Sequence, residues 1–339
     1  MVRLRDIAEV AGVSVMTVSK ALRDKRDVSV ATKARLRALA DRMGYVPDLS
    51  ATGLRSRSTR LLGLVIPATT DPVYARVQLA IEQSAAEHGY DLLFSQSMGK
   101  PDREDAAVRR LLARRVDGVF LWPVPCMARP TPALDEVRRR GLPVVVLGHR
   151  PVSCEGMVNV ETDDLAASAS VTRHLLELGH RRIAFLAGPQ ASPSAQERLQ
   201  GYRRALREAG IEPDDRLVFN AGSTLEEGTH AALQWMQERT GATAIQAVND
   251  LVAIGAGEAL LGQGLRIPGD VSLAGFGNIL TSEHFRVPLT TVRQPKLRLG
   301  TVAMDLMLAW LREGKPESRR LPAELVVRAS SGPPPTVPA

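Results

Sequence analysis

The 339-residue sequence predicts an α/β protein, with an N-terminal three-helix domain ahead of a two-lobed core of doubly wound parallel sheets. Three observations support this fold class. Residues 4–22 carry helical apolar spacing on both sides of a Gly-Val-Ser turn. From residue 61, apolar runs alternate with helical stretches in two successive series, the pattern of parallel sheets covered by helices on both faces. The excess basic charge is confined to the first 60 residues.

The first two helices are predicted to flank Gly12-Val13-Ser14. Gly12 can accept the positive φ that ends one helix, and the Ser14 oxygen can cap the next. Such a pair is a helix-turn-helix, whose second helix places its N-terminal residues on base edges in the major groove. The alternative is a small helical hairpin with a solvated polar face.

The second helix supplies the predicted DNA contacts. Its candidate base readers are Val15, Met16 and Lys20, while Thr17 and Ser19 carry hydroxyls suited to phosphate oxygens. Charge favours DNA over the hairpin alternative. The first 60 residues hold 13 Lys and Arg against 6 Asp and Glu, whereas the remainder holds 31 of each. A basic segment gains affinity for DNA by releasing counterions from the phosphates.

A third helix is predicted from Val30 to Met43, with Gly44 as its stop. Residues 47–60 then form a basic linker. Pro47 can start a helix there, but Gly53 costs about 1 kcal/mol relative to Ala inside one, so the residues alone favour a flexible tether.

The core is predicted as two strand-and-helix series. The first has strands at Leu61–Ala68, Asp91–Ser97, Gly118–Pro123 and Pro143–His149, with helices at Pro72–Gly89, Asp102–Arg115 and Thr131–Gly141. The second has strands at Arg182–Pro189, Leu217–Gly222, Ala244–Asn249 and Val271–Phe276, with helices near 164–179, 194–210, 224–239 and 250–263. Ligands of such sheets bind outside the carboxyl ends of the strands, between two facing units. The tail at 330–339 is rich in Pro and Gly and is expected to be disordered.

Composition and motifs exclude several classes of protein. There is no apolar leader and no run of about 18 apolar residues, so we expect a cytoplasmic protein without a membrane span. Cys126 and Cys154 lack metal-ligand spacing, which favours reduced thiols and no metal site. The sequence contains no G-x-S-x-G, H-E-x-x-H or G-x-x-x-x-G-K-S/T motif, so neither an enzyme nor a bound cofactor is predicted.

Several motifs together resemble the lactose repressor and galactose repressor (LacI/GalR) family of bacterial transcription regulators, over residues 3 to about 329. They are Asp6-Ile7-Ala8, Gly12-Val13-Ser14, Thr17-Val18-Ser19, Gly44-Tyr45-Val46-Pro47, Leu178-Gly179-His180-Arg181-Arg182-Ile183, Leu186-Ala187-Gly188-Pro189, Glu197-Arg198-Leu199-Gln200-Gly201-Tyr202, Asn249-Asp250 and Pro288-Leu289-Thr290-Thr291-Val292. The resemblance implies a DNA-binding domain at 1–46, a hinge at 47–60 and a periplasmic-binding-protein-like effector core at 61–329.

The resemblance also implies roles for individual residues. Leu54 matches the hinge leucine that wedges into a minor-groove base step, and Ser50, Ala51 and Arg55 would contact DNA beside it. The implied effector contacts are Asp71, Tyr74, Trp122, Arg150, Arg198, Asn249, Asp250 and Phe276. The alternative for Arg198 is a surface ion pair, and for several of the others a purely structural role.

One departure from the family concerns the effector. Many members have Asp after the Gly-Phe that ends the last strand, whereas this chain has Gly277. The loss of an acceptor of sugar hydroxyls, together with the presence of His149 and Arg150, favours an anionic ligand such as a sugar acid or phosphorylated sugar.

The predicted function is a ligand-responsive transcriptional regulator, a repressor that binds a palindromic operator as a homodimer in the cytoplasm, associated with the nucleoid. Its effector is expected to be a sugar, a sugar acid or a related metabolite, with no membrane partner. Two alternatives share parts of this architecture. A periplasmic-type binding protein would lack the basic N-terminal domain, and an architectural DNA binder would lack an effector.

Overall fold

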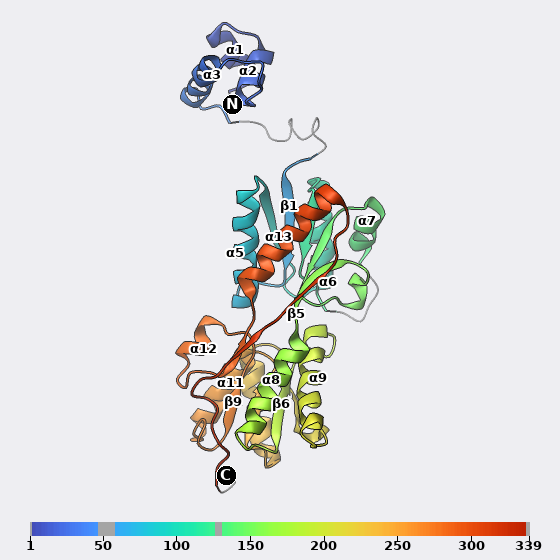
Figure 1. Cartoon of the computed structure of the whole chain (residues 1–339), viewed down its shortest axis with the longest axis vertical. Helices are drawn as coiled ribbons and strands as arrows, with labels where there is room; N and C mark the ends of the chain where they lie inside the picture. Colours follow the sequence, from blue (N-terminus) through green and yellow to red (C-terminus); the bar gives the residue numbers. More distant parts are fainter. Residues whose placement is uncertain (1, 47–57, 126–130, 337–339) are drawn as a thin grey trace. The chain divides into compact units, whose positions relative to one another are not determined.

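The computed structural model describes residues 2–46, 58–125 and 131–336, and the chain divides into two compact units, Met1–Thr59 and Arg60–Ala339. The first unit is called the head and the second the core (Figure 1). The predicted linker contacts Ser50, Ala51, Leu54 and Arg55, with Gly53 and Cys126, lie outside the described residues.

The head is a three-helix unit with its own small core. Its helices are α1 (Leu4–Ala11), α2 (Val15–Leu22) and α3 (Val30–Arg42). Gly12 ends α1 at φ +67°, and Ser14 Oγ accepts a hydrogen bond from Thr17 N at 3.1 Å. Fully buried Ile7 and Leu36 pack at the centre. The predicted helix-turn-helix and third helix are therefore confirmed.

The N-terminal lobe of the core contains a six-stranded parallel sheet in the order β11-β5-β4-β3-β1-β2. Its strands are β1 (Leu61–Ile66), β2 (Asp91–Gln96), β3 (Gly118–Leu121), β4 (Val144–Leu147), β5 (Val158–Thr162) and β11 (Arg319–Leu321). Its helices are α5 (Pro72–Glu87), α6 (Pro101–Ala113), α7 (Pro132–Arg140) and α13 (Lys296–Glu313). Helices α5 and α13 share one apolar cluster with the sheet, and α6 and α7 share another on the opposite face.

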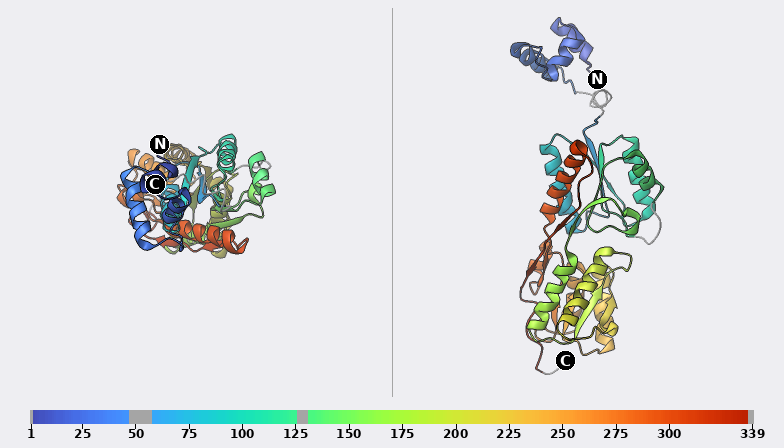
Figure 2. Two further views of the ribbon diagram at one scale, coloured as in Figure 1. Left: turned by 90° about the horizontal axis from the view of Figure 1, so that it is seen from above. Right: turned by 45° about the vertical axis from the view of Figure 1, so that its right-hand side comes forward.

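The C-terminal lobe contains a four-stranded parallel sheet in the order β7-β6-β8-β9 and a separate two-stranded ribbon, β10-β12. The strands are β6 (Ile183–Ala187), β7 (Val218–Asn220), β8 (Ala244–Ala247), β9 (Ser272–Ala274), β10 (Thr291–Arg293) and β12 (Glu324–Val326). The helices are α8 (Asp164–Glu177), α9 (Pro193–Glu208), α10 (Leu225–Glu238), α11 (Asp250–Gly262) and α12 (Leu280–His284). Short 3-10 turns lie at η1 (Val152–Cys154) and η2 (Asp215–Leu217). Two doubly wound lobes were predicted, and the structure confirms them (Figure 2).

The chain passes between the two lobes three times, which the sequence did not predict. It leaves the N-terminal lobe after β5, returns before α13, and leaves again after β11 (Figure 1). The first and third passages are hydrogen-bonded to each other, because Asp163 N donates to Leu321 O at 2.8 Å. The N-terminal lobe therefore contains α13 and β11, which come from near the end of the chain.

The expectation of a disordered tail is wrong for residues 330–336. Ser330 is fully buried, and its Oγ accepts a hydrogen bond from Thr290 N at 2.8 Å and donates to Leu273 O at 2.5 Å. The carbonyl of Gly332 lies 2.9 Å from Nε2 of His180. The tail forms no helix or strand over these residues, but hydrogen bonds to the C-terminal lobe satisfy its polar groups and hold it in place.

Candidate DNA-binding and effector-binding sites

The first turn of α2 carries exposed apolar side chains. Val15 is 44% exposed and Met16 is 64% exposed. Thr17 Oγ1 lies 2.9 Å from the Ser14 oxygen, and Ser19 is half-buried. Exposed aliphatic groups at this end of a reading helix suit contact with thymine methyl groups, so the surface fits the predicted role of Val15 and Met16.

Lys20 is not a free cation in the head. Its ammonium pairs with the carboxylate of Asp27 in the loop after α2. The loop is fastened to α3, because Asp24 Oδ1 lies 3.1 Å from Lys33 Nζ and 3.0 Å from Arg37 Nη2. An ammonium carries three donors, so pairing with Asp27 orients Lys20 and leaves it donors for a further contact. Sequence reasoning did not identify Asp27 because the pair depends on how the loop folds back.

In the C-terminal lobe, Arg198 is held from several directions. From α9 it donates to Asp164 Oδ2 through Nε at 2.9 Å, and Nη2 lies 2.8 Å from the same oxygen. Its Nη1 donates to Val248 O at 2.8 Å, and its Cζ lies 3.9 Å from the centroid of the Phe276 ring. The side chains of Arg198 and Asp164 are 13% and 1% exposed. This geometry replaces the surface ion pair considered for Arg198 with a buried one.

Asp164 has a second, unused oxygen. Oδ1 is buried, and no hydrogen-bond partner contacts it among the residues that the structure describes. Burial raises the pKa of Asp164, and the charge of Arg198 opposes that rise. The carboxylate at the start of α8 therefore holds the arginine with one oxygen and leaves the other as an acceptor. Sequence reasoning did not select Asp164.

The N-terminal lobe contributes one acid and two aromatic rings. Asp71 Oδ1 caps α5 by accepting from Val73 N at 2.8 Å. Burial raises the pKa of Asp71 while the charge of Arg198 lowers it, so these two predicted residues lie within electrostatic range. The rings of Tyr74 and Trp122 meet edge to face, with centroids 4.5 Å apart. We call Asp71, Tyr74, Trp122, Asp164, Arg198 and Phe276 the interlobe site.

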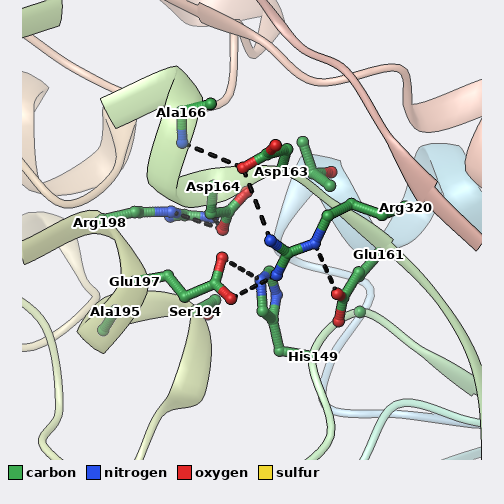
Figure 3. Close-up of polar contacts among 12 residues, drawn as sticks. His149, Glu161, Asp163, Asp164, Ala166, Ser194, Ala195, Glu197, Arg198 and Arg320 are labelled. Atoms are coloured by element: carbon green, nitrogen blue, oxygen red, sulfur yellow. Dashed lines mark hydrogen bonds and ion pairs between the residues drawn. The ribbon is translucent and has the colours of Figure 1, made fainter. Parts of the chain in front are cut away.

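A second cluster of charges joins the lobes beside this site (Figure 3). His149 Nε2, on the loop after β4, lies 2.9 Å from Glu197 Oε2 on α9. Glu197 also pairs with Arg320 of β11, whose Nε donates to Glu161 Oε1 at 2.8 Å. We call His149, Glu161, Glu197 and Arg320 the interlobe clasp.

The clasp and the interlobe site are linked through neighbouring residues. Glu197 directly precedes Arg198, and Asp163, which lies 3.7 Å from Arg320, directly precedes Asp164. Burial of His149 opposes its charged form, but the carboxylates of Glu197 and Asp164 raise its pKa above the ordinary 6.5. A movement of the backbone at Arg198 would therefore also displace Glu197, whose contacts join the lobes.

Three of the predicted effector residues, Arg150, Asn249 and Asp250, use their polar atoms in contacts outside the interlobe site. Arg150 is exposed, and its Nη1 donates to Met157 O at 2.8 Å. Asn249 caps α11, with Oδ1 accepting from Val252 N at 2.7 Å and Nδ2 donating to Ser223 O at 2.9 Å.

Asp250 is 1% exposed, and both of its oxygens are occupied. It accepts from Ile279 N at 3.0 Å, Ser282 Oγ at 2.6 Å and Thr291 Oγ1 at 2.5 Å. Asn249 and Asp250 thus support the loops of their own lobe. The two residues cited for an anionic effector, His149 and Arg150, are both already engaged.

A separate hollow of about 500 Å³ lies between α9 and β7, lined by Gln190, Gln196, Arg203, Asp215 and Asn220 among others. None of the predicted effector residues lines it. In the described part of the chain, no cluster of three His, Cys, Asp or Glu side chains could hold a metal, and no helix is long and apolar enough to span a membrane.

The two sites define a class of protein: a regulator that binds DNA through its head and a small molecule through its core. Comparison with known proteins identifies the family within this class. Residues 3–48 match the family model "Bacterial regulatory proteins, lacI family", and residues 59–329 match "Periplasmic binding proteins and sugar binding domain of LacI family". The chain belongs to the LacI family of bacterial transcription regulators.

Similar proteins cover nearly the whole chain. The HTH-type transcriptional repressor CytR of Escherichia coli (strain K12) is 32% identical over 97% of this chain and 96% of its own length. PurR of Photobacterium profundum, another HTH-type transcriptional repressor, is 30% identical over 97% and 98%. The lac repressor dimer bound to operator and the anti-inducer ONPF superposes with a TM-score of 0.87 at 27% identity, covering 98% of this chain and 99% of that one. The CelR–cellobiose complex gives 0.73 at 30%, over 98% and 100%.

Proposed function

We propose that this protein is a repressor that binds a palindromic operator as a homodimer, and that an effector at the interlobe site sets its affinity for DNA. The observation that carries the proposal is the arrangement around Arg198, which meets Asp164 and Phe276 in one lobe and lies within electrostatic range of Asp71 of the other. A guanidinium fixed in this way presents a planar set of donors to a ligand held between the lobes.

The two walls of the site suit a metabolite with hydroxyl groups and a partly apolar face. Tyr74 and Trp122 supply an aromatic surface from the N-terminal lobe. Arg198 and the unused oxygen of Asp164 supply a donor and an acceptor from the other lobe. Ligand sites combine apolar lining with a few fixed polar groups in this manner. Sugars, sugar acids and related metabolites have matching chemistry.

The dimer is supported by exposed apolar side chains on both lobes. Leu79 of α5, and Phe94 and Met98 in and after the edge strand β2, are exposed, as are Leu225 and Leu280 of the C-terminal lobe. An interface between two subunits would bury such groups. A relative of this fold, the lac repressor, is described as a dimer on its operator. A twofold dimer carries two heads and therefore favours a palindromic site.

Control of DNA binding would follow from linkage between the two sites. An effector that binds one arrangement of the lobes more tightly shifts the population toward that arrangement. Its contacts with Arg198 would act on the clasp through Glu197. The proposed hinge contacts Ser50, Ala51, Leu54 and Arg55 would carry the shift to the minor groove.

We propose no catalytic activity for this protein. We also propose that it acts in the cytoplasm, associated with the nucleoid. It is tested with the full-length chain. DNA sites are selected from a random library, and the affinity of the chosen site is then measured with and without a panel of sugars, sugar acids and nucleosides. We expect a palindromic consensus and at least one compound that changes both affinity and thermal stability. An asymmetric consensus, or affinity insensitive to every compound, would favour an architectural DNA binder.

A further inference from the structure

Lys296, the first residue of α13, is a half-buried cation beside the interlobe site. Its Nζ donates to the carbonyls of Gly277 and of Asn278, the latter at 3.0 Å. No carboxylate of the described residues forms an ion pair with it. Its charge is therefore held by neutral carbonyl oxygens, an unusual arrangement for a partly buried ammonium, which is normally paired with an acid.

The loop that holds Lys296 also contacts Arg198. Phe276 lies under the guanidinium of Arg198, and Gly277, the next residue, accepts from Lys296. Asp71 lies within electrostatic range of both cations. Two positive groups from different segments of the chain thus converge on the loop after β9, at the interlobe site.

The charged groups around Lys296 would favour a bound anion. Burial lowers the pKa of Lys296, and Arg76 and Arg293 lower it further, while Asp250 and Asp71 raise it. Asp250 is occupied by hydroxyl and backbone donors inside its own lobe. An anionic ligand would relieve the repulsion among these cations.

The backbone at Gly277 is unfavourable for an acidic side chain. Its φ is +136°, a conformation that side chains rarely adopt. The Gly277 carbonyl instead binds Lys296.

We propose that Lys296 is a specificity-determining residue of the effector site, and that it selects a small hydroxylated metabolite carrying an oxyanion, either a carboxylate or a phosphate. The third ammonium donor of Lys296 binds the anionic group, while the Asp164 oxygen accepts a hydroxyl. His149 and Arg150, which first suggested an acid from the sequence, take no part because their partners are protein groups. The inference rests on the proposed function of the interlobe site.

The test measures binding of matched probes to the full-length protein by calorimetry and thermal shift. The probes are glucose, gluconate, glucose 6-phosphate, ribose, ribose 5-phosphate and inorganic phosphate. We expect an acid or a phosphate to bind more tightly than its neutral parent, and the gluconate and phosphate arms to distinguish the two oxyanions. Lys296→Met should weaken the preferred probe about 10- to 100-fold, the worth of one hydrogen bond between charged groups.

Two variants make the result specific. Lys296→Arg keeps the charge and should retain the preference for the acid. Lys315→Met removes a lysine that also donates to a backbone carbonyl, Gly156 O at 2.8 Å, but is exposed beyond the opposite end of α13, and it should change nothing. A neutral sugar that binds best and equally well to Lys296→Met would overturn the inference while supporting the effector site. The absence of binding by every oxyanion probe would also overturn it.

Discussion

The head and the core each use a cation paired with a carboxylate, but solvent reaches the two pairs very differently. Lys20 and Asp27 in the head have side chains 43% and 53% exposed. Arg198 and Asp164 in the core are 13% and 1% exposed. Water and salt screen the first pair, so it can exchange partners with DNA at little cost. The second pair lies where an uncompensated charge is strongly disfavoured.

The difference indicates what each pair can do in recognition. An exposed pair can orient a side chain and still release it to a phosphate or base. A buried pair keeps its geometry in the free protein, so a ligand meets donors that are already in place. The ion pair of His149 with Glu197 differs from both. Its side chains are largely shielded from solvent, but they belong to different lobes.

The largest expected effect comes from Arg198→Ala. The substitution leaves Asp164 buried without its partner, and breaking a buried pair in this way costs about 3–5 kcal/mol of folding free energy. It should also abolish stabilisation by the effector. Urea unfolding with and without the effector measures both changes.

The matched control is Arg204→Ala on the same helix. Arg204 pairs with Glu208 at 2.7 Å but is exposed, so its loss should cost less than about 1 kcal/mol and leave the effector response intact. Equal destabilisation by the two variants would mean that the contrast between buried and exposed pairs does not hold.

The second effect is a dependence of stability on pH through His149. Its pKa is raised in the folded protein, so its contribution is fully present below pH 6.5 and is lost as the pH rises through the raised value. The groups facing it are Glu197, Asp164 and Glu161, with Arg320 bound to the same Glu197. The difference in unfolding free energy between wild type and His149→Gln should therefore shrink from pH 6 to pH 9.

Two histidines that contact the tail, His174 and His180, require separate treatment. Burial lowers the pKa values of His174 and His180, so they destabilise the protein on the acid side, in both wild type and variant. Their effect cancels in the difference. His230→Gln, at an exposed histidine of α10, is the matched substitution outside the clasp. A His149→Gln difference that is independent of pH would show that the clasp does not need the charged imidazole.

The smallest effect on folding is expected from Asp27→Asn, with little change in melting temperature because the pair is exposed. Its effect on DNA should be larger. Removal of a negative charge should raise affinity for all sequences and steepen the salt dependence, since phosphates no longer meet the carboxylate. Freed from its partner, Lys20 should read its base pair less selectively.

Selection from a random DNA library with wild type and Asp27→Asn measures this loss of preference. Asp41→Asn, at an exposed aspartate of α3 outside this pair, should raise affinity slightly without altering the consensus. An unchanged consensus with Asp27→Asn would make Lys20 a phosphate contact.

The sequence predicted the parts of the fold that depend on local patterns. Gly12 and Ser14 act within a few residues of the helices that they end and begin, and long apolar runs predict β1 and β6. Strands β10, β11 and β12 have three residues each, too few to show a pattern. Helix α13 packs on α5, more than 200 residues earlier in the chain, a contact that periodicity cannot predict.

The residues of the candidate site also divide into those that the sequence identified and those whose contacts depend on the fold. The resemblance to a family identified Arg198, but its partner Asp164 lies 34 residues earlier, and their pairing depends on how α8 packs on α9. Asn249 and Asp250 have the residue types of ligand contacts, yet backbone groups and hydroxyls of their own lobe use their polar atoms. Sequence alone does not reveal which polar atoms are already satisfied.

The three passages of the chain between the lobes set an order for folding during synthesis. The head has its own core and is complete once α3 has left the ribosome. The N-terminal lobe, although it begins at residue 61, lacks α13 and its edge strand β11 until Leu321 has been made. At roughly 5–20 residues per second, the interval from the end of β5 to that point is about 8–30 seconds. For that time the face of β4 and β5 that later packs on α13 is left uncovered, so the nascent chain is more prone to aggregation, and depends more on chaperones, than the finished protein.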